Sequence, residues 1–98
     1  MLTIEQIRAA VTPICERYGV NKMWLFGSYA RGEADEQSDV DLMVDDGNSP
    51  KLRGFAWGGL YSDIRDALGV EIDVLSLKST RQKFLNIISK DEVLLYAR

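Results

Sequence analysis

Hydrophobic residues recur every three or four positions in the first part of the chain. Between Thr3 and Tyr18 this stripe predicts an amphipathic helix, and it consists of Ile4, Ile7, Val11, Ile14, Cys15 and Tyr18. Thr3 followed by Gln6 is the pattern of a capping box, and Gly19 is a typical residue for ending a helix. Cys15 lies on the stripe, so we expect a buried and unreactive thiol.

A second stripe at helical spacing predicts a helix from Lys51 to Leu68. Its members are Leu52, Ala56, Leu60, Ile64, Ala67 and Leu68. Each glycine inside this stretch costs about 1 kcal/mol relative to alanine, so we expect the helix to fray or bend near its glycines. Phe55 lies off the stripe, where it would face solvent unless another surface covers it.

Short apolar runs predict the strands. We expect strands at Lys22–Phe26, at Val70–Leu75, and in the run that begins with Asp39-Val40-Asp41 and ends at Val44. A last extended piece is expected at Val93–Tyr96, after a helix at Thr80–Ser89. Together with a short helix after the first strand, this order predicts an α/β fold with a small mixed sheet packed against helices.

Composition indicates one folded domain over residues 1–98. With 46% hydrophobic and 28% charged residues the chain has material for a single core. The formal net charge of −3 disfavours a broad nucleic-acid-binding surface, which would carry clustered lysines and arginines. The single cysteine excludes an internal disulfide, and no basic region followed by a long apolar run opens the chain. We therefore expect a cytoplasmic protein with no membrane association, for which nucleic acid is not the direct partner.

Candidate chemistry is concentrated in the sequence LFGSYARGEADEQSDVDLMV, residues 25–44. Asp39 and Asp41 are two residues apart on an expected strand, so their carboxylates share one face and need a neutralising partner. The chain contains no histidine, and carboxylate oxygens favour hard cations such as Mg²⁺. Gly27 lets the backbone approach a ligand closely, and Ser28 is the expected N-cap of a short helix whose N–H groups favour a phosphate.

Each of these features has a simpler interpretation when it is taken alone. A single Asp-x-Asp is usually a solvated strand end, and a single Gly-Ser is usually a turn. Asp45 and Asp46 follow the same strand in a turn-rich loop, where we expect them to face water. Neither this loop nor residues 35–41 has the ligand pattern of an EF-hand calcium site. The joint pattern, and not any one element, carries the functional signal.

Gly-Ser, ten residues and then Asp-x-Asp, with strand-like sequence on both sides, resembles the nucleotidyltransferase signature of the DNA polymerase beta superfamily. The letters FGSYARGEADEQSDVDLMV are most similar to the minimal nucleotidyltransferases, or MNT domains, and the resemblance covers nearly the whole chain. It implies a polymerase beta palm-like fold. It also implies transfer of a nucleoside monophosphate from an NTP, usually ATP, to an acceptor hydroxyl with release of pyrophosphate.

The resemblance implies a role for each aspartate. Asp39 and Asp41 would hold two Mg²⁺ ions, and Asp73 would complete the metal site from the neighbouring strand and accept the proton of the acceptor. A carboxylate inside a β-branched run is costly when it is buried unpaired, which gives Asp73 a reason to bind a ligand. Glu71 lies on the same face of that strand and is the alternative ligand.

The phosphates of the nucleotide would be held on the other side of the site. The resemblance implies that Gly27, Ser28 and neighbouring backbone N–H groups cradle them. Arg31 has two possible roles, since it can meet the triphosphate or pair with a loop carboxylate.

The resemblance also implies a partner. MNT proteins are commonly paired, as the antitoxin, with a HEPN-domain ribonuclease toxin, and in some pairs the MNT protein adenylylates a tyrosine of the toxin. Larger nucleotidyltransferases use a second domain for the acceptor, so here the acceptor surface is expected from another protein. The alternative is a binding module that neutralises its partner by masking it. A glycosyltransferase normally needs a larger fold, and purely structural aspartates leave the Gly-Ser spacing unexplained.

Overall fold

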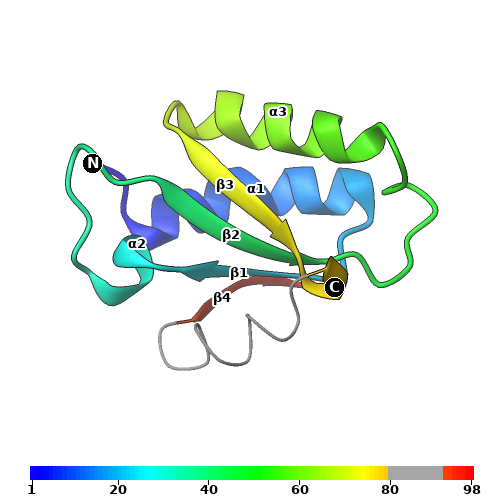
Figure 1. The fold of residues 1–98 in the computed structure, drawn as a ribbon, viewed down its shortest axis with the longest axis horizontal. Helices are drawn as coiled ribbons and strands as arrows, with labels where there is room; N and C mark the ends of the chain where they lie inside the picture. The colour runs from blue at the N-terminus through cyan, green and yellow to red at the C-terminus, as the bar shows by residue number, and fades with distance from the viewer. Residues whose placement is uncertain (80–91) are drawn as a thin grey trace.

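The computed structural model of the protein describes residues 1–79 and 92–98 (Figure 1). The elements are α1 (Ile4–Tyr18), β1 (Lys22–Phe26), α2 (Ser28–Arg31), β2 (Val40–Asp45), α3 (Ala56–Leu68), β3 (Ile72–Ser76) and β4 (Val93–Ala97). The helix predicted at Thr80–Ser89 lies outside the described residues. Within the described ranges, no helix combines the length and the apolar character needed to cross a membrane.

Four strands form one mixed sheet in the order β3-β2-β1-β4. β1 pairs antiparallel with both β2 and β4, whereas β2 and β3 run parallel. A parallel pair requires a crossover, and α3 supplies it. The sheet therefore places the end of β1 and the start of β2 next to each other, beside the start of β3 (Figure 1).

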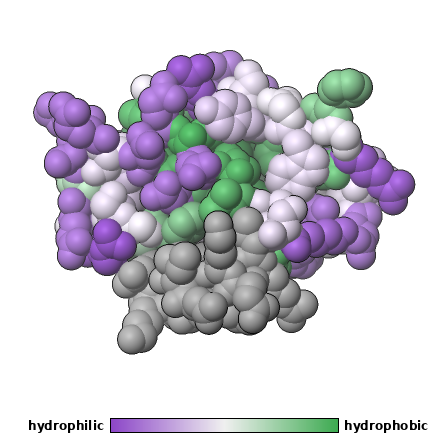
Figure 2. Space-filling view, in the orientation of Figure 1, coloured by the Kyte–Doolittle hydropathy of each residue, from purple (hydrophilic) through white to green (hydrophobic). Residues whose placement is uncertain are grey.

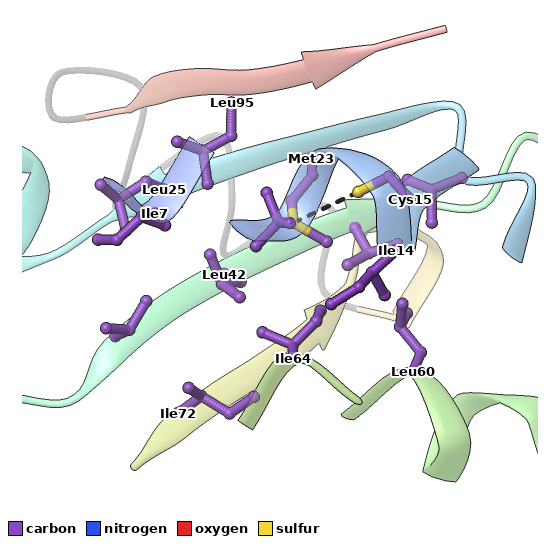
Figure 3. Close-up of a cluster of buried hydrophobic side chains, with 14 of the residues drawn as sticks. Ile7, Ile14, Cys15, Met23, Leu25, Leu42, Leu60, Ile64, Ile72 and Leu95 are labelled. Carbon is purple, nitrogen blue, oxygen red and sulfur yellow. Dashed lines mark hydrogen bonds between the residues drawn. The ribbon is translucent and has the colours of Figure 1, made fainter. Parts of the chain in front are cut away.

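The core lies between one face of the sheet and the helices α1 and α3 (Figure 3). Its fully buried side chains include alternate residues of the strands and the apolar stripes of both helices: Ile7, Val11, Met23, Leu25, Val40, Leu42, Val44, Leu60 and Ile64. Each such side chain contributes about 1.5–3 kcal/mol by leaving water. On the outer surface, polar residues form much of the rim in one view, and apolar residues gather nearer its middle (Figure 2).

α1 confirms the first predicted helix, including both of its ends. Thr3 is the N-cap, and the capping box with Gln6 is formed in both directions, at 2.8 and 3.0 Å. Gly19 ends the helix in the left-handed conformation, with φ at 67°. Cys15 is fully buried beside the Met23 sulfur, and burial raises the pKa of its thiol to about 12, as expected for an unreactive cysteine.

The second long helix begins later than its apolar stripe predicted. α3 starts at Ala56 and not at Lys51, because residues 51–55 form turns in which Gly54 has a φ of 54°. Leu52 is buried nonetheless, so the loop contributes to the core without being helical. Phe55 is fully exposed, in agreement with the helical-wheel prediction.

The strands are close to the predicted ones. β1 has the predicted bounds, and β4 extends the predicted piece by one residue, to Ala97. β2 begins at Val40, so Asp39 immediately precedes the strand. β3 begins at Ile72 and not at Val70, and it continues to Ser76.

Candidate active site

Two aspartates meet across the parallel pair of strands. Asp41 of β2 is in register with Asp73 of β3 on one side and with Phe26 of β1 on the other. Val40 and Leu42 point into the core, so Asp41 points to the opposite face of the sheet. Residues paired across strands share a face, and Asp41 and Asp73 therefore lie side by side there.

Gly27 lies directly against the carboxylate of Asp41. A Cβ added to Gly27 would stand 2.4 Å from Oδ2 of Asp41, which no side chain could tolerate without movement. The backbone at Gly27, with φ 76° and ψ −154°, is in a region that is essentially restricted to glycine. Two independent reasons therefore require glycine at this position: the backbone conformation and the lack of space beside the aspartate.

The expectation that Ser28 caps the short helix is wrong. Gly27 occupies the N-cap position of α2, without a side-chain hydrogen bond, and Ser28 is already the first helical residue. The backbone of Gly27 turns the chain one residue earlier than predicted, and its carbonyl accepts the first hydrogen bond of the turn from the Arg31 N–H, at 3.1 Å. The first N–H groups of a helix have no partner inside it, so their proposed phosphate contact stays a prediction.

The charges of two predicted carboxylates act on the third, Asp41. Partial burial raises the pKa of Asp41, and the neighbouring charges of Asp73 and then Asp39 raise it further, whereas Arg31 acts in the opposite direction. Asp41 is half-buried, while Asp39 and Asp73 are exposed. The site is thus crowded with negative charge, which is the condition that a bound cation relieves.

The carboxylates fit a hard cation in their chemistry but are not yet gathered around one position. Among residues 1–79 and 92–98, no three acidic, histidine or cysteine side chains are placed to hold a metal ion as they stand. Oxygen donors of this kind are the ligands that Mg²⁺ prefers.

The structure separates the two candidates for the third acidic ligand. Asp73 is in register with Asp41, whereas Glu71 precedes β3 and its carboxylate accepts a 2.7 Å hydrogen bond from Arg65. Glu71 is thereby held towards the end of α3. Position and pairing both favour Asp73.

Arg31 pairs with a loop carboxylate in this structure. Its Nε lies 3.1 Å from Oε2 of Glu33, and the charge of Arg31 also reaches Asp41. One of the two possible roles is therefore observed, and the role at a triphosphate stays a prediction.

Tyr29 is a site-supporting residue that the sequence did not reveal. It is buried and packs into the main core, so it anchors the short α2 beside the glycine turn. It also lines a small cavity of about 180 Å³ together with Met1, Leu2, Thr3, Ile4, Gly32 and Ala34. The available signal was an aromatic residue directly after Gly-Ser, in a helix too short to show a periodic stripe.

Comparisons with known sequences identify the family of the chain. Residues 9–98 match the family described as Polymerase beta, Nucleotidyltransferase. The protein adenylyltransferase MntA of Thermococcus cleftensis is 35% identical over 97 residues, which span 95% of this chain and 96% of that protein. A provisionally named protein adenylyltransferase of Methanocaldococcus jannaschii is 33% identical over 93 residues, spanning 95% of this chain and 92% of the relative.

Solved structures share the fold. A chain from a toxin-antitoxin complex with AMP-PNP superposes with a TM-score of 0.75 at 21% identity, covering 99% of this chain and 75% of that chain. A chain from a complex of tri-AMPylated Shewanella oneidensis HEPN toxin with MNT antitoxin gives 0.72 at 17% identity, covering 98% and 74%. A provisionally identified minimal nucleotidyltransferase gives 0.75 at 29% identity, covering 94% and 95%. The predicted α/β fold with a small mixed sheet is confirmed.

Proposed function

The chain belongs to the polymerase beta nucleotidyltransferase family, and from this premise we propose that it transfers AMP from ATP to a hydroxyl group of a protein partner. The observation that carries the proposal is the register of Asp41 with Asp73 on parallel strands, with the Gly27 backbone against Asp41. The name of the Thermococcus relative, which matches over nearly its whole length, supports a protein as the acceptor.

Nucleotidyltransferases generally use divalent metal ions, and Asp39, Asp41 and Asp73 are the residues that would hold two Mg²⁺ ions here. When bound, these ions would stabilise the entering and leaving oxygens of an in-line displacement. The donor set supports the assignment, because all three groups are carboxylates and a cation would relieve the repulsion that Asp73 and Asp39 exert on Asp41.

The other residues of the site would bind and orient the reactants. Gly27, Ser28 and the first N–H groups of α2 would hold phosphate oxygens beside Asp41. Asp73 is exposed, so it can meet a hydroxyl presented from outside and accept its proton. The acceptor oxygen forms a bond to the α-phosphorus, the α–β phosphoanhydride bond breaks, and pyrophosphate leaves with the electron pair. Positioning and charge are the main demands of such chemistry.

The partner we propose is a HEPN-type toxin, with this chain as the cytoplasmic antitoxin of the pair. Chains of the same fold occur in toxin-antitoxin complexes, one with AMP-PNP and one with a tri-AMPylated HEPN toxin. The net charge of −3 supports a folded protein over a long RNA as acceptor, because phosphate binding calls for clustered basic residues.

The alternative is a binding module that neutralises its partner by masking it, without catalysis. In that case the carboxylates of the site would not be needed for neutralisation.

Mass spectrometry of a reconstituted pair distinguishes the two functions. We expect the isolated chain to turn over ATP very slowly, and a HEPN-type partner with Mg²⁺ and ATP to gain mass increments of AMP. The double variant Asp39→Ala/Asp41→Ala should abolish these increments, while Asp45→Asn/Asp46→Asn removes the same charge at the other end of the strand and should retain them. If the Asp39/Asp41 variant still neutralises the toxin fully in cells, masking is the main function.

A further inference from the structure

The loop after α2 returns a carboxylate to Arg31. Gly32 adopts the left-handed conformation, with φ at 74°, and the N–H of Glu33 donates to the carbonyl of Ser28 at 2.9 Å. This hydrogen bond fixes the backbone of Glu33 at the end of α2. Its carboxylate there accepts from Nε of Arg31, at 3.1 Å.

Arg31 belongs to the same short helix as the glycine turn of the site. Its N–H donates to the carbonyl of Gly27 at 3.1 Å, and Gly27 lies against the carboxylate of Asp41. The side chains of Arg31 and Glu33 are 41% and 66% exposed, so a ligand entering from solvent can reach the ion pair. The guanidinium therefore has Glu33 as one acceptor, and it belongs to the helix whose first residues hold the phosphates in the proposed function.

We propose that Glu33 is a positioning residue that competes with the triphosphate for Arg31. In the nucleotide-free protein Glu33 holds the guanidinium; when the nucleotide binds, Arg31 exchanges the carboxylate for a phosphate oxygen, which is a stronger and more highly charged acceptor. Glu33 thereby lowers the affinity for the nucleotide and sets the ATP concentration at which the site fills. The inference rests on the proposed function, since it assumes that the triphosphate binds beside Gly27 and Asp41.

The expected effect is modest because the pair is exposed. Exposed ion pairs contribute little free energy. If the Arg31–Glu33 pair must break before the nucleotide binds, its removal corresponds to a change of about two- to fivefold in the dissociation constant of the nucleotide. Glu36 offers a matched control, since it is an exposed glutamate in the same loop and Glu36→Gln makes the same change in charge.

Calorimetry with Mg²⁺ and AMP-PNP tests the competition. We expect Glu33→Gln to lower the Kd by about two- to fivefold relative to Glu36→Gln. With the partner present, the KM for ATP should fall by a similar factor while kcat stays unchanged. In an Arg31→Gln background, Glu33→Gln should have no larger effect than Glu36→Gln, because the guanidinium for which Glu33 competes is absent.

The other possible outcomes contradict either the competition between Glu33 and the triphosphate or the proposed function itself. Equal Kd values for Glu33→Gln and Glu36→Gln, weaker binding by Glu33→Gln, or an undiminished effect in the Arg31→Gln background would each overturn the competition while leaving the proposed function in place. Absence of nucleotide binding by the wild type and all variants would overturn the proposed function, and the competition with it.

Discussion

The two ends of strand β2 carry aspartates in opposite environments. At the end of the strand, Asp45 accepts hydrogen bonds from the Asn21 side chain at 2.8 Å and from the Gly47 N–H at 3.1 Å. Asp46 accepts from the Asn48 N–H at 2.9 Å and lies 3.4 Å from the Lys78 ammonium. The prediction that both face water is wrong, because both are partly buried and hold the turn after β2.

At the start of β2, the described residues show no such donor for the Asp41 side chain. The charges that act on this carboxylate include those of Asp73 and Asp39. Carboxylates supplied with donors stabilise the fold, whereas crowded carboxylates keep their capacity for an external cation. The same residue type therefore serves structure at one end of the strand and, in our proposal, chemistry at the other.

The largest expected effect is the difference in activity between removing a charge at the start of β2 and removing one at its end. We expect Asp41→Asn to lower AMP transfer by about a thousandfold or more, because metal stabilisation of transition-state charge is worth several kcal/mol. Binding of AMP-PNP should lose its dependence on Mg²⁺ in calorimetry. Asp45→Asn is the control and should keep wild-type transfer. If Asp41→Asn keeps an unchanged Mg²⁺-dependent affinity for AMP-PNP, Asp41 does not bind the metal.

Asp73 should affect turnover much more than nucleotide binding. Asp39 and Asp41 still hold the nucleotide's metal in Asp73→Ala, whereas proton acceptance is lost, so we expect a decrease in transfer on the order of a hundredfold. Single-turnover kinetics with parallel calorimetry would measure the two effects. Glu71→Ala is the comparison, and wild-type transfer by Asp73→Ala with loss in Glu71→Ala would move the role to Glu71.

The glycine turn gives a test that needs no activity. Gly27→Ala places a Cβ against Asp41 in a backbone region closed to other residues, and we expect a stability loss of about 3 kcal/mol in urea unfolding. Gly32 also has a positive φ, but a Cβ there would meet no atom within 4 Å. Gly32→Ala should therefore cost only about 1 kcal/mol. Equal losses would mean that the contact with Asp41 is not what restricts Gly27.

The smallest predicted effect concerns pH and stability in the absence of ligand. The pKa of Asp41 is raised above its ordinary value of 3.8, so the fold favours the protonated group; this contribution is present below pH 3.8 and is lost as pH rises through the folded-state pKa. Asp41→Asn should raise Tm at neutral pH, with the difference vanishing below pH 3.8. Asp45→Asn should instead lower stability at neutral pH by about 1 kcal/mol. A lower Tm of Asp41→Asn at pH 7 would contradict the conclusion that burial and the neighbouring carboxylates disfavour the ionised form of Asp41.

Local sequence signals predicted the elements whose ends are made by neighbouring residues. The capping box at Thr3 and the stop at Gly19 define α1, and β1 agrees residue for residue. The predicted start of the second long helix is wrong, because apolar residues at helical spacing indicate which residues are buried and do not prove that all of them are helical. Leu52 is buried from a loop, and the backbone at Gly54 prevents the helix from extending back to it.

The sequence by itself determined which residues are candidates for the site, because Gly27, Asp39 and Asp41 lie in one contiguous pattern and Asp73 interrupts an apolar run. Only the tertiary structure decided how they meet. The register of β2 with β3 places Asp73, and not Glu71, beside Asp41, and the pairing of Phe26 with Asp41 brings the Gly27 backbone against a carboxylate. Strand register depends on contacts between segments far apart in the chain, and a shift of one residue would turn each of these side chains to the other face.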